Sequence, residues 1–187
     1  MEKQSVDIFK IIHRFHMVIS KVKEIKRTGW IQRGIEDAES VADHSFAVLS
    51  LSMILAEIRG LNVVEVVRMA ILHDLAEAVI GDLTPSQKRE KIREYERVER
   101  EFIESLVKLM PKDIGEKYLE AWRRYLEGES REARLVGLVD KLEMGLQAVI
   151  YLKKTGNEKL LEIYRSALEF VENDSEILNI LKEALNQ

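Results

Sequence analysis

His73 is the most informative of the four histidines in this sequence, because other ionisable groups surround it. Asp74 follows it directly and Glu77 lies four residues on, inside the apolar run VVEVVRMAILHDLAEAVI of residues 63–80. Burying ionisable groups in such a run is costly unless something compensates them. A bound divalent cation is the simplest compensation for a neighbouring His and Asp.

Two more potential metal ligands lie in apolar stretches far from His73. His44 takes a position in its predicted helix where Leu or Val is expected, and Asp140 lies in the run LVGLVDKLEMGLQAVIYL. A satisfied core histidine with a structural salt bridge or cap would explain the His73–Asp74 pair if it stood alone. Packing does not readily explain three apolar helices that each bring a ligand type inward. We therefore predict a site for one divalent metal ion, with His44, His73, Asp74 and Asp140 as its ligands.

The elements that must position these residues are predicted to be helices. Apolar residues at steps of three and four predict a first helix over residues 8–22, followed by a loop around Gly29 and Gly34. Ser40 and Asp43 have the spacing of a capping box, with Asp in place of the usual Glu. The helix that begins at this capping box would point His44 inward.

The run of residues 63–80 is apolar nearly all round, which predicts one continuous helix in the middle of a bundle. In such a helix His73 and Glu77 would share a face. Acids and bases at helical spacing predict a solvated surface helix over residues 86–110, so Lys88 is expected to face solvent.

Three further helical patterns follow, and no convincing strand alternation appears anywhere in the sequence. No Gly/Ser-rich linker or internal repeat divides the chain. The predicted fold class is therefore all-α, with one helical-bundle domain over residues 1–187 and about seven or eight helices.

Composition limits the partners of the protein. The 187 residues carry a net charge of −4 with both signs interspersed, which is no electrostatic footprint for nucleic acid. Cysteine is absent, which excludes disulfides, a thiolate zinc site and a cysteine nucleophile. The first residues lack a secretory signal, and no uncharged run approaches a membrane span. We expect a cytoplasmic protein with a small-molecule substrate and neither a nucleic-acid nor a membrane partner.

The order H…HD…D, formed by the four predicted ligands, is the pattern of the HD-domain phosphohydrolase superfamily. Longer segments resemble its 5′-deoxynucleotidase (HDDC2-like) group, and they span most of the chain. The four-residue pattern is moderately specific, whereas its combination with HDLAEAxxGDLTP is strongly so. The segments are RTGW (27–30), ESVADHS (39–45), ILHDLAEAVIGDLTP (71–85) and EARLVGLVDKLEM (132–144).

The resemblance implies an HD-type fold, a homodimer, and hydrolysis of deoxynucleoside 5′-monophosphates to deoxynucleoside and phosphate. Glu77 and Asp82 match the catalytic acids of the group. Glu77 would orient or deprotonate the attacking water, and Asp82 would position the substrate or assist proton transfer to the 5′-oxygen. The simpler alternatives are a salt-bridge partner for Glu77 and a turn or cap residue for Asp82.

Trp30 matches a tryptophan that lies near the sugar in the group and is credited with excluding ribonucleotides, although it could be an ordinary packing aromatic. Well-known bacterial members have a phosphate-binding arginine directly before this tryptophan, where this chain has Gly29. Arg27 and Arg33 are the candidates to supply that charge. Lys88 could also contact phosphate, but a solvated lysine on a charged helix is the better expectation.

The predicted ligand set, two imidazoles and two carboxylates, would leave two open positions in an octahedral site for water and a phosphate oxygen. The ion would polarise the phosphoryl oxygen and lower the pKa of its water, towards about 7 in favourable cases. Without thiolates, the sequence does not choose among Mn, Co, Fe, Mg and Zn.

Two other functions remain open at this point. Another HD-type hydrolase, acting on a deoxynucleoside triphosphate, a cyclic nucleotide or an alarmone, would use the same metal site. A helical scaffold that keeps a metal only for stability is the alternative from a different class, but it has no need for the two additional acids.

Overall fold

The structure, a computed structural model, describes residues 6–186, and within this range it contains helices and no strand. The all-α fold class is therefore confirmed. Four of the elements are short: α2 (Thr28–Ile31), α5 (Glu77–Ile80), α6 (Pro85–Glu90) and the 3-10 turn η1 (Glu158–Leu160). The eight longer helices are α1 (Ile8–Glu24), α3 (Val41–Ile58), α4 (Val63–Leu72), α7 (Ile92–Val107), α8 (Lys112–Glu127), α9 (Arg131–Thr155), α10 (Leu161–Phe170) and α11 (Ser175–Asn186).

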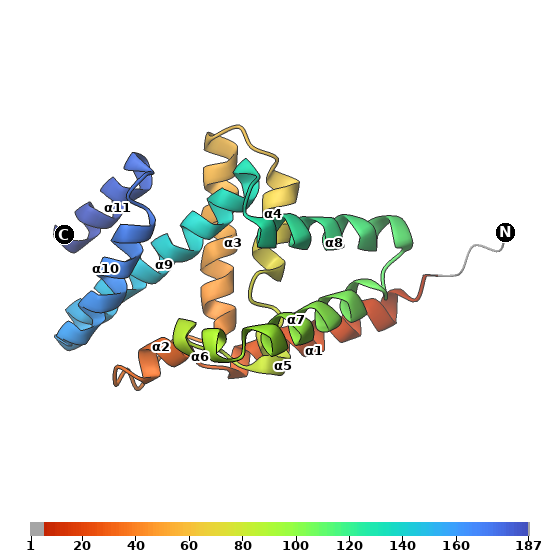
Figure 1. The fold of residues 1–187 in the computed structure, drawn as a ribbon, viewed down its shortest axis with the longest axis horizontal. Coiled ribbons are helices and arrows are strands. Elements are labelled where there is room, and N and C mark those ends of the chain that lie inside the picture. Colours follow the sequence, from red (N-terminus) through yellow and green to blue (C-terminus); the bar gives the residue numbers. More distant parts are fainter. Residues whose placement is uncertain (1–5, 187) are drawn as a thin grey trace.

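The 25-residue helix α9 is the central element, and α3, α4, α8, α10 and α11 all pack against it. Figure 1 shows it crossing α3 and continuing alongside α10 and α11. Gly145 permits the close approach on that side, because a Cβ atom there would lie 2.6 Å from Leu181 Cδ2 and 3.0 Å from Ala167 Cβ. The main apolar core forms around α9 from these helices.

A second apolar cluster joins α1, α7 and α8 to the segment that connects α4 with α5. Its buried members include Val18 of α1, Leu72 at the end of α4, Leu75 of the connecting segment, Ile103 of α7 and Trp122 of α8. The connecting segment, which also carries His73 and Asp74, is thus anchored by Leu75 and Ala76 in this second cluster.

The predicted capping box at the start of α3 is confirmed. Ser40 accepts a hydrogen bond from the Asp43 N–H at 3.1 Å, and the Asp43 carboxylate accepts one from the Ser40 N–H at 2.8 Å. At its other end α3 turns through Gly60, whose φ of 62° is the left-handed conformation that glycine tolerates. Helix α4 then returns beside α3, so the end of α4 lies near the start of α3 (Figure 1).

The prediction of one continuous helix over residues 63–80 is wrong. Helix α4 ends at Leu72, and α5 begins only at Glu77. In between, the backbone bonds tighten to three-residue steps, as in Leu75 N–H to Leu72 O at 3.2 Å. His73 contributes to the break, because its Nδ1 contacts the carbonyl oxygen of Ala70 at 2.7 Å. A sequence period does not reveal such a local tightening.

The predicted surface helix over residues 86–110 is also divided, with α6 and α7 meeting at Lys91 (φ −129°, ψ 33°). Helix α7 is not solvated all round, since Phe102, Ile103 and Leu106 are buried. The predicted loop around Gly29 contains the short helix α2.

Several large apolar side chains remain exposed on the first half of α1 and on α3. Phe46, Met53 and Ile54 lie on one face of α3 and are 72%, 41% and 50% exposed. By length and composition alone, α3 could cross a membrane, with a mean hydropathy of 1.5. A single such helix is weak evidence, and α3 also packs against α1, α4 and α9 and carries the buried His44.

Candidate active site

All four predicted metal ligands converge at one point beneath the start of α3. His44 comes from the first turn of α3, His73 and Asp74 from the end of α4, and Asp140 from the middle of α9. Ligand atoms of His44, His73 and Asp140 lie within 4.8 Å of one another. Asp74 Oδ2 lies 3.4 Å from His73 Nε2 and 3.7 Å from His44 Nε2, and Asp140 Oδ1 lies 3.2 Å from His44 Nε2.

The donor set fits a divalent cation. The Nε2 atoms of His44 and His73 are buried and have no hydrogen-bond partner among the described residues. Each ring uses its other nitrogen, since His73 Nδ1 contacts Ala70 O at 2.7 Å and His44 Nδ1 contacts Glu143 Oε2 at 2.5 Å. Two imidazole nitrogens without partners that face two carboxylates are the arrangement of a metal site with its supporting outer contacts.

The two carboxylates of this cluster stay ionised although they are buried. Burial raises the pKa of Asp74, but His73 and Arg27 outweigh it and hold that pKa well below its usual range. For Asp140, burial is likewise outweighed by Lys141 and by His44, and the pKa is again lowered. Both groups are therefore in the ionised form that a metal ligand requires.

The pKa of His44 is shifted upwards, opposite to the shifts of Asp74 and Asp140. Burial and the charge of Arg27 lower its pKa, but contacts with Asp140 and Glu143 outweigh them and raise the pKa to about 10. A divalent ion would take over the compensating role of this proton, because metal binding to an imidazole displaces the proton.

Glu77 is 1% exposed and lies at the start of α5. Burial, Asp74 and Asp82 raise the pKa of Glu77 to about 9, although the Lys88 ammonium, 3.4 Å from Oε1, opposes the shift. Its Oε2 atom has no hydrogen-bond partner in the described chain. A carboxyl group that holds a proton near neutral pH beside a metal cluster has the properties of a general acid or base.

Asp82 connects the loop before α6 to α2. Its carboxylate accepts hydrogen bonds from the Thr28 N–H and from Arg27 Nη1, the latter at 3.1 Å, and its carbonyl oxygen accepts from Thr28 Oγ1 at 2.7 Å. The capping alternative raised by the sequence therefore describes part of its contacts. Asp82 also lines the cavity above the four predicted metal ligands, where its carboxylate is within reach of a bound substrate.

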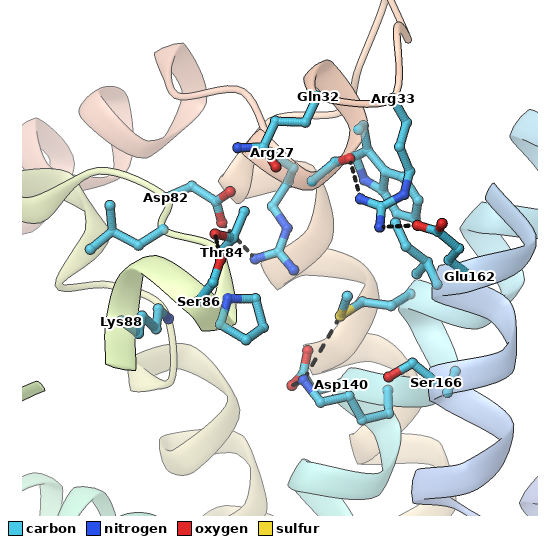
Figure 2. Close-up of a pocket in the computed structure, with 18 of the residues that line it drawn as sticks. Arg27, Gln32, Arg33, Asp82, Thr84, Ser86, Lys88, Asp140, Glu162 and Ser166 are labelled. Carbon is cyan, nitrogen blue, oxygen red and sulfur yellow. Dashed lines mark hydrogen bonds and ion pairs between the residues drawn. The ribbon is translucent and has the colours of Figure 1, made fainter. Parts of the chain in front are cut away.

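The cavity above the cluster has a volume of about 660 Å³, within the usual range of small-molecule sites. Figure 2 shows Arg27, Asp82 and Lys88 on one side, while Asp140 and Ser166 lie on the other. Met144, Ile163 and Ala167 add an apolar wall. A phosphate-sized charge and a flat apolar ring could thus be accommodated at opposite ends.

The three residues predicted to contact substrate line this cavity, but all three also have partners in the protein. Trp30 is 2% exposed and donates from Nε1 to Glu39 Oε1 at 2.8 Å. Arg27 donates to Asp82 and also to Asp74, at 3.0 Å. Arg33 donates to Glu162 at 2.9 Å and to the carbonyl oxygen of Gly29 at 3.0 Å, which joins α2 to α10.

For Lys88 the sequence favoured the wrong one of two alternatives, and Glu143 was missed. The expectation that Lys88 faces solvent is wrong, because Lys88 lines the cavity, contacts Glu77 and lies 4.9 Å from the centre of the Tyr95 ring. Glu143 was not considered, yet it contacts His44. The signal for Glu143 was available: it is an acid in an apolar helix, three residues after Asp140.

The HD-domain family, HD_3, matches residues 19–179. The chain belongs to this family. Among curated relatives, the HD-domain chain is 31% identical over 170 residues to human "5′-deoxynucleotidase HDDC2", which covers 91% of this chain and 82% of the relative. The mouse protein of the same name is 35% identical over 74% of this chain and 68% of its own length.

Solved structures agree with the HD-domain fold. A crystal structure of the PH0347 protein from Pyrococcus horikoshii superposes with a TM-score of 0.74 at 32% identity, over 96% of this chain and 99% of that one. The predicted HD-type fold is therefore confirmed, and the cluster of His and Asp ligands suits the divalent metal expected of a metal-dependent HD domain.

Replacing Glu77 by Gln tests the proton held at this site. In the metal-free protein, the folded state binds this proton up to pH 9 or so, whereas the unfolded chain releases it near 4.5. The free energy of unfolding should therefore fall across this window as pH rises, and Glu77→Gln should remove that part of the fall. Urea unfolding at several pH values in chelator should show the free energy of unfolding of the variant rising relative to that of the wild type as pH increases. The exposed control Glu172→Gln should instead follow the wild type in parallel. A parallel curve for Glu77→Gln would contradict the assignment.

Proposed function

We propose that this HD-domain protein is a metal-dependent 5′-deoxynucleotidase that hydrolyses deoxynucleoside 5′-monophosphates to deoxynucleoside and phosphate. The observation that carries the proposal is the pair of partnerless imidazole nitrogens facing Asp74 and Asp140 beneath a cavity that also contains basic side chains. Relatives of this name, at 31–35% identity over most of the chain, support the same activity.

His44, His73, Asp74 and Asp140 would hold one divalent ion. When bound, the ion would supply Lewis acidity towards a phosphoryl oxygen and towards water. The mixed nitrogen and oxygen ligands are compatible with Mn, Co, Fe, Mg or Zn. Burial of both imidazoles keeps bulk water away from the ligands and strengthens their interactions with charge.

Glu77 supports acid–base catalysis at the same site. Its Oε2 is buried and free of hydrogen bonds within residues 6–186. A divalent ion held by the neighbouring ligands would lower the Glu77 pKa, which would let the ionised carboxylate accept a proton from water and return it during the reaction. Asp82 holds Arg27, whose guanidinium also contacts Asp74. Asp82 lies on the cavity wall, and we assign it to orienting the substrate or to assisting proton transfer to the 5′-oxygen.

Trp30 supports recognition of the sugar through a face of its ring, since its N–H is already bonded to Glu39. An indole fixed at its nitrogen and packed edge-to-face on Tyr151, with ring centres 5.3 Å apart, has little freedom to move. A rigid wall of this kind can exclude a ribose 2′-hydroxyl by shape.

Lys88 is a better candidate for the phosphate than Arg27 or Arg33. Both arginines use their guanidinium groups in contacts at 2.9–3.1 Å, whereas Lys88 faces Glu77, a carboxyl group with a raised pKa, at 3.4 Å. With one long hydrogen bond to Glu77, the Lys88 ammonium keeps further N–H donors for an incoming anion. We therefore assign the phosphate contact to Lys88.

A substrate panel tests the activity. The metal-stripped protein, loaded in turn with each candidate metal, should release phosphate from dAMP and dCMP but not from AMP or CMP. Glu77→Gln should lower the single-turnover rate by about 10²–10⁴-fold, the usual loss for a general acid or base. Asp82→Asn, which can still accept from Thr28, separates a substrate role from a capping role.

Each rival function makes its own prediction in this panel. Triphosphate release from dGTP, or cleavage of a cyclic dinucleotide, without action on dAMP would replace the proposed substrate class. A metal-dependent rise in the melting temperature with no hydrolysis of any ester would indicate a scaffold. Asp82→Asn with wild-type kinetics would leave Asp82 as a cap alone.

The Lys88 assignment is tested by replacing the charge. Lys88→Gln should lower kcat/KM for dAMP by about 10- to 150-fold, the value of one hydrogen bond to a charged group. Lys88→Arg should retain much of the activity because it keeps the charge. Lys91→Gln removes an exposed lysine three residues away and serves as the control. Equal kinetics for Lys88→Gln and Lys91→Gln would return the phosphate contact to the arginines.

We also propose a homodimer, with a second copy of this chain on the exposed apolar face of α3. The resemblance to the 5′-deoxynucleotidase group and the exposure of Phe46, Met53 and Ile54 support it. A monomer that exposes a row of large apolar residues on one helix is uncommon, because such patches usually mark an interface.

Light scattering after size exclusion tests the dimer. The wild type should have about twice the mass of the chain, and the double variant Phe46→Asp, Ile54→Asp should be monomeric, because a second copy would bury two charges. Leu126→Asp places the same charge on an exposed apolar position of α8 and should leave the mass unchanged. A monomeric wild type would rule out the homodimer.

A further inference from the structure

Two acidic side chains outside the predicted ligand set lie directly behind the metal cluster. Glu143, in α9, is 5% exposed, and Glu39, just before α3, is partly buried. Their carboxylate oxygens and a ring nitrogen of His44 lie within 4.8 Å of one another. A buried pair of acids is unfavourable for stability alone, so each should have a partner that requires it.

The partner of Glu143 is the metal-ligand imidazole. Glu143 Oε2 lies 2.5 Å from Nδ1 of His44, which is fully buried. A carboxylate can only accept at Nδ1, and this fixes the ring proton there when the imidazole is neutral. The Nε2 lone pair then points towards Asp74 and Asp140, where a cation would lie. An apolar residue of the same size would pack in α9 but would not select this tautomer.

The partner of Glu39 is the cavity-lining tryptophan. Glu39 Oε1 accepts the indole N–H of Trp30 at 2.8 Å. The backbone of Glu39 is itself held on both sides: its carbonyl oxygen accepts from the Arg27 N–H at 3.0 Å, and its N–H donates to the Tyr151 hydroxyl at 2.8 Å. These contacts fix the backbone position from which the Glu39 carboxylate reaches the indole.

We propose that Glu143 and Glu39 are adjacent positioning residues, Glu143 for the imidazole of His44 towards the metal and Glu39 for the indole of Trp30 towards the sugar. The inference rests on the metal site and the sugar contact of the proposed function. It adds that the two are set by neighbouring carboxylates in one buried cluster, each with its own measurable consequence.

The Glu143 half is tested by metal binding, without turnover. Co²⁺ titrated into metal-stripped protein by calorimetry should bind about 10- to 100-fold more weakly to Glu143→Met than to the wild type, the usual loss when a supporting carboxylate is removed. Glu143→Gln should lose less, because its amide oxygen can still accept from Nδ1. Glu99→Met, which removes another buried carboxylate from α7, should bind Co²⁺ as the wild type does.

The Glu39 half is tested by sugar discrimination. Glu39→Met should reduce the preference for dCMP over CMP in kcat/KM by at least about fivefold, because the indole loses its acceptor. Glu39→Gln should restore the preference, since its carbonyl oxygen can accept the same hydrogen bond. A purely structural role would instead lower the melting temperature without changing the ratio.

The outcomes separate this inference from the proposed function. Wild-type Co²⁺ affinity in Glu143→Met, or an equal loss in Glu99→Met, would overturn the role of Glu143. An unchanged dCMP preference in Glu39→Met would overturn the role of Glu39. A wild-type protein that binds Co²⁺ but hydrolyses no deoxynucleotide would contradict the proposed substrate, while the Glu143 result would remain valid. A wild type that binds no Co²⁺ would overturn both, because Glu143 would then have no ligand to position.

Discussion

The whole site depends on one electrostatic constraint, the burial of ionised carboxylates and imidazoles where three apolar helices meet. Asp74 and Asp140 remain charged there because cationic neighbours outweigh the cost of burial. Such a cluster is destabilising unless opposite charge is held close to it. The arrangement of the helices can be understood as the means of keeping these groups within a few ångströms of one another.

Helix α9 meets this constraint because it is long and central. Its middle carries Asp140 to the site, while the rest of its length packs against five other helices. The break between α4 and α5 contributes in a different way. By ending the helix at Leu72, it turns His73 and Asp74 towards α3 and lets Glu77 begin a new helix under the cavity. A straight helix would have fixed these residues at successive angles of about 100°.

The sequence predicted the four ligands because each is an ionisable residue in an apolar stretch, and that signal does not depend on exact helix boundaries. It also predicted the cap at Ser40, where the residue types themselves make the hydrogen bonds. It failed to predict that the helix breaks at His73, because the ring contacts the carbonyl oxygen of Ala70 and the spacing of the apolar residues does not reveal this contact. It favoured a solvated Lys88, because a lysine in a highly charged segment usually faces solvent. In the structure the short helix α6 places Lys88 in the lining of the cavity.

Charge balance in the cavity suggests how a substrate phosphate could be accepted at an acidic site. Arg27 and Lys141 contact carboxylates whose pKa values are held low, so their charge is already matched. Lys88 differs, because its hydrogen bond to Glu77 is long, at 3.4 Å, and burial raises the pKa of that carboxyl in the metal-free protein. An anion arriving near Lys88 therefore meets a cation that is less closely paired than Arg27 or Lys141. A divalent ion at the neighbouring ligands would lower the Glu77 pKa, whereas a phosphate at Lys88 would raise it, so the two charges together would set how readily Glu77 exchanges a proton with water.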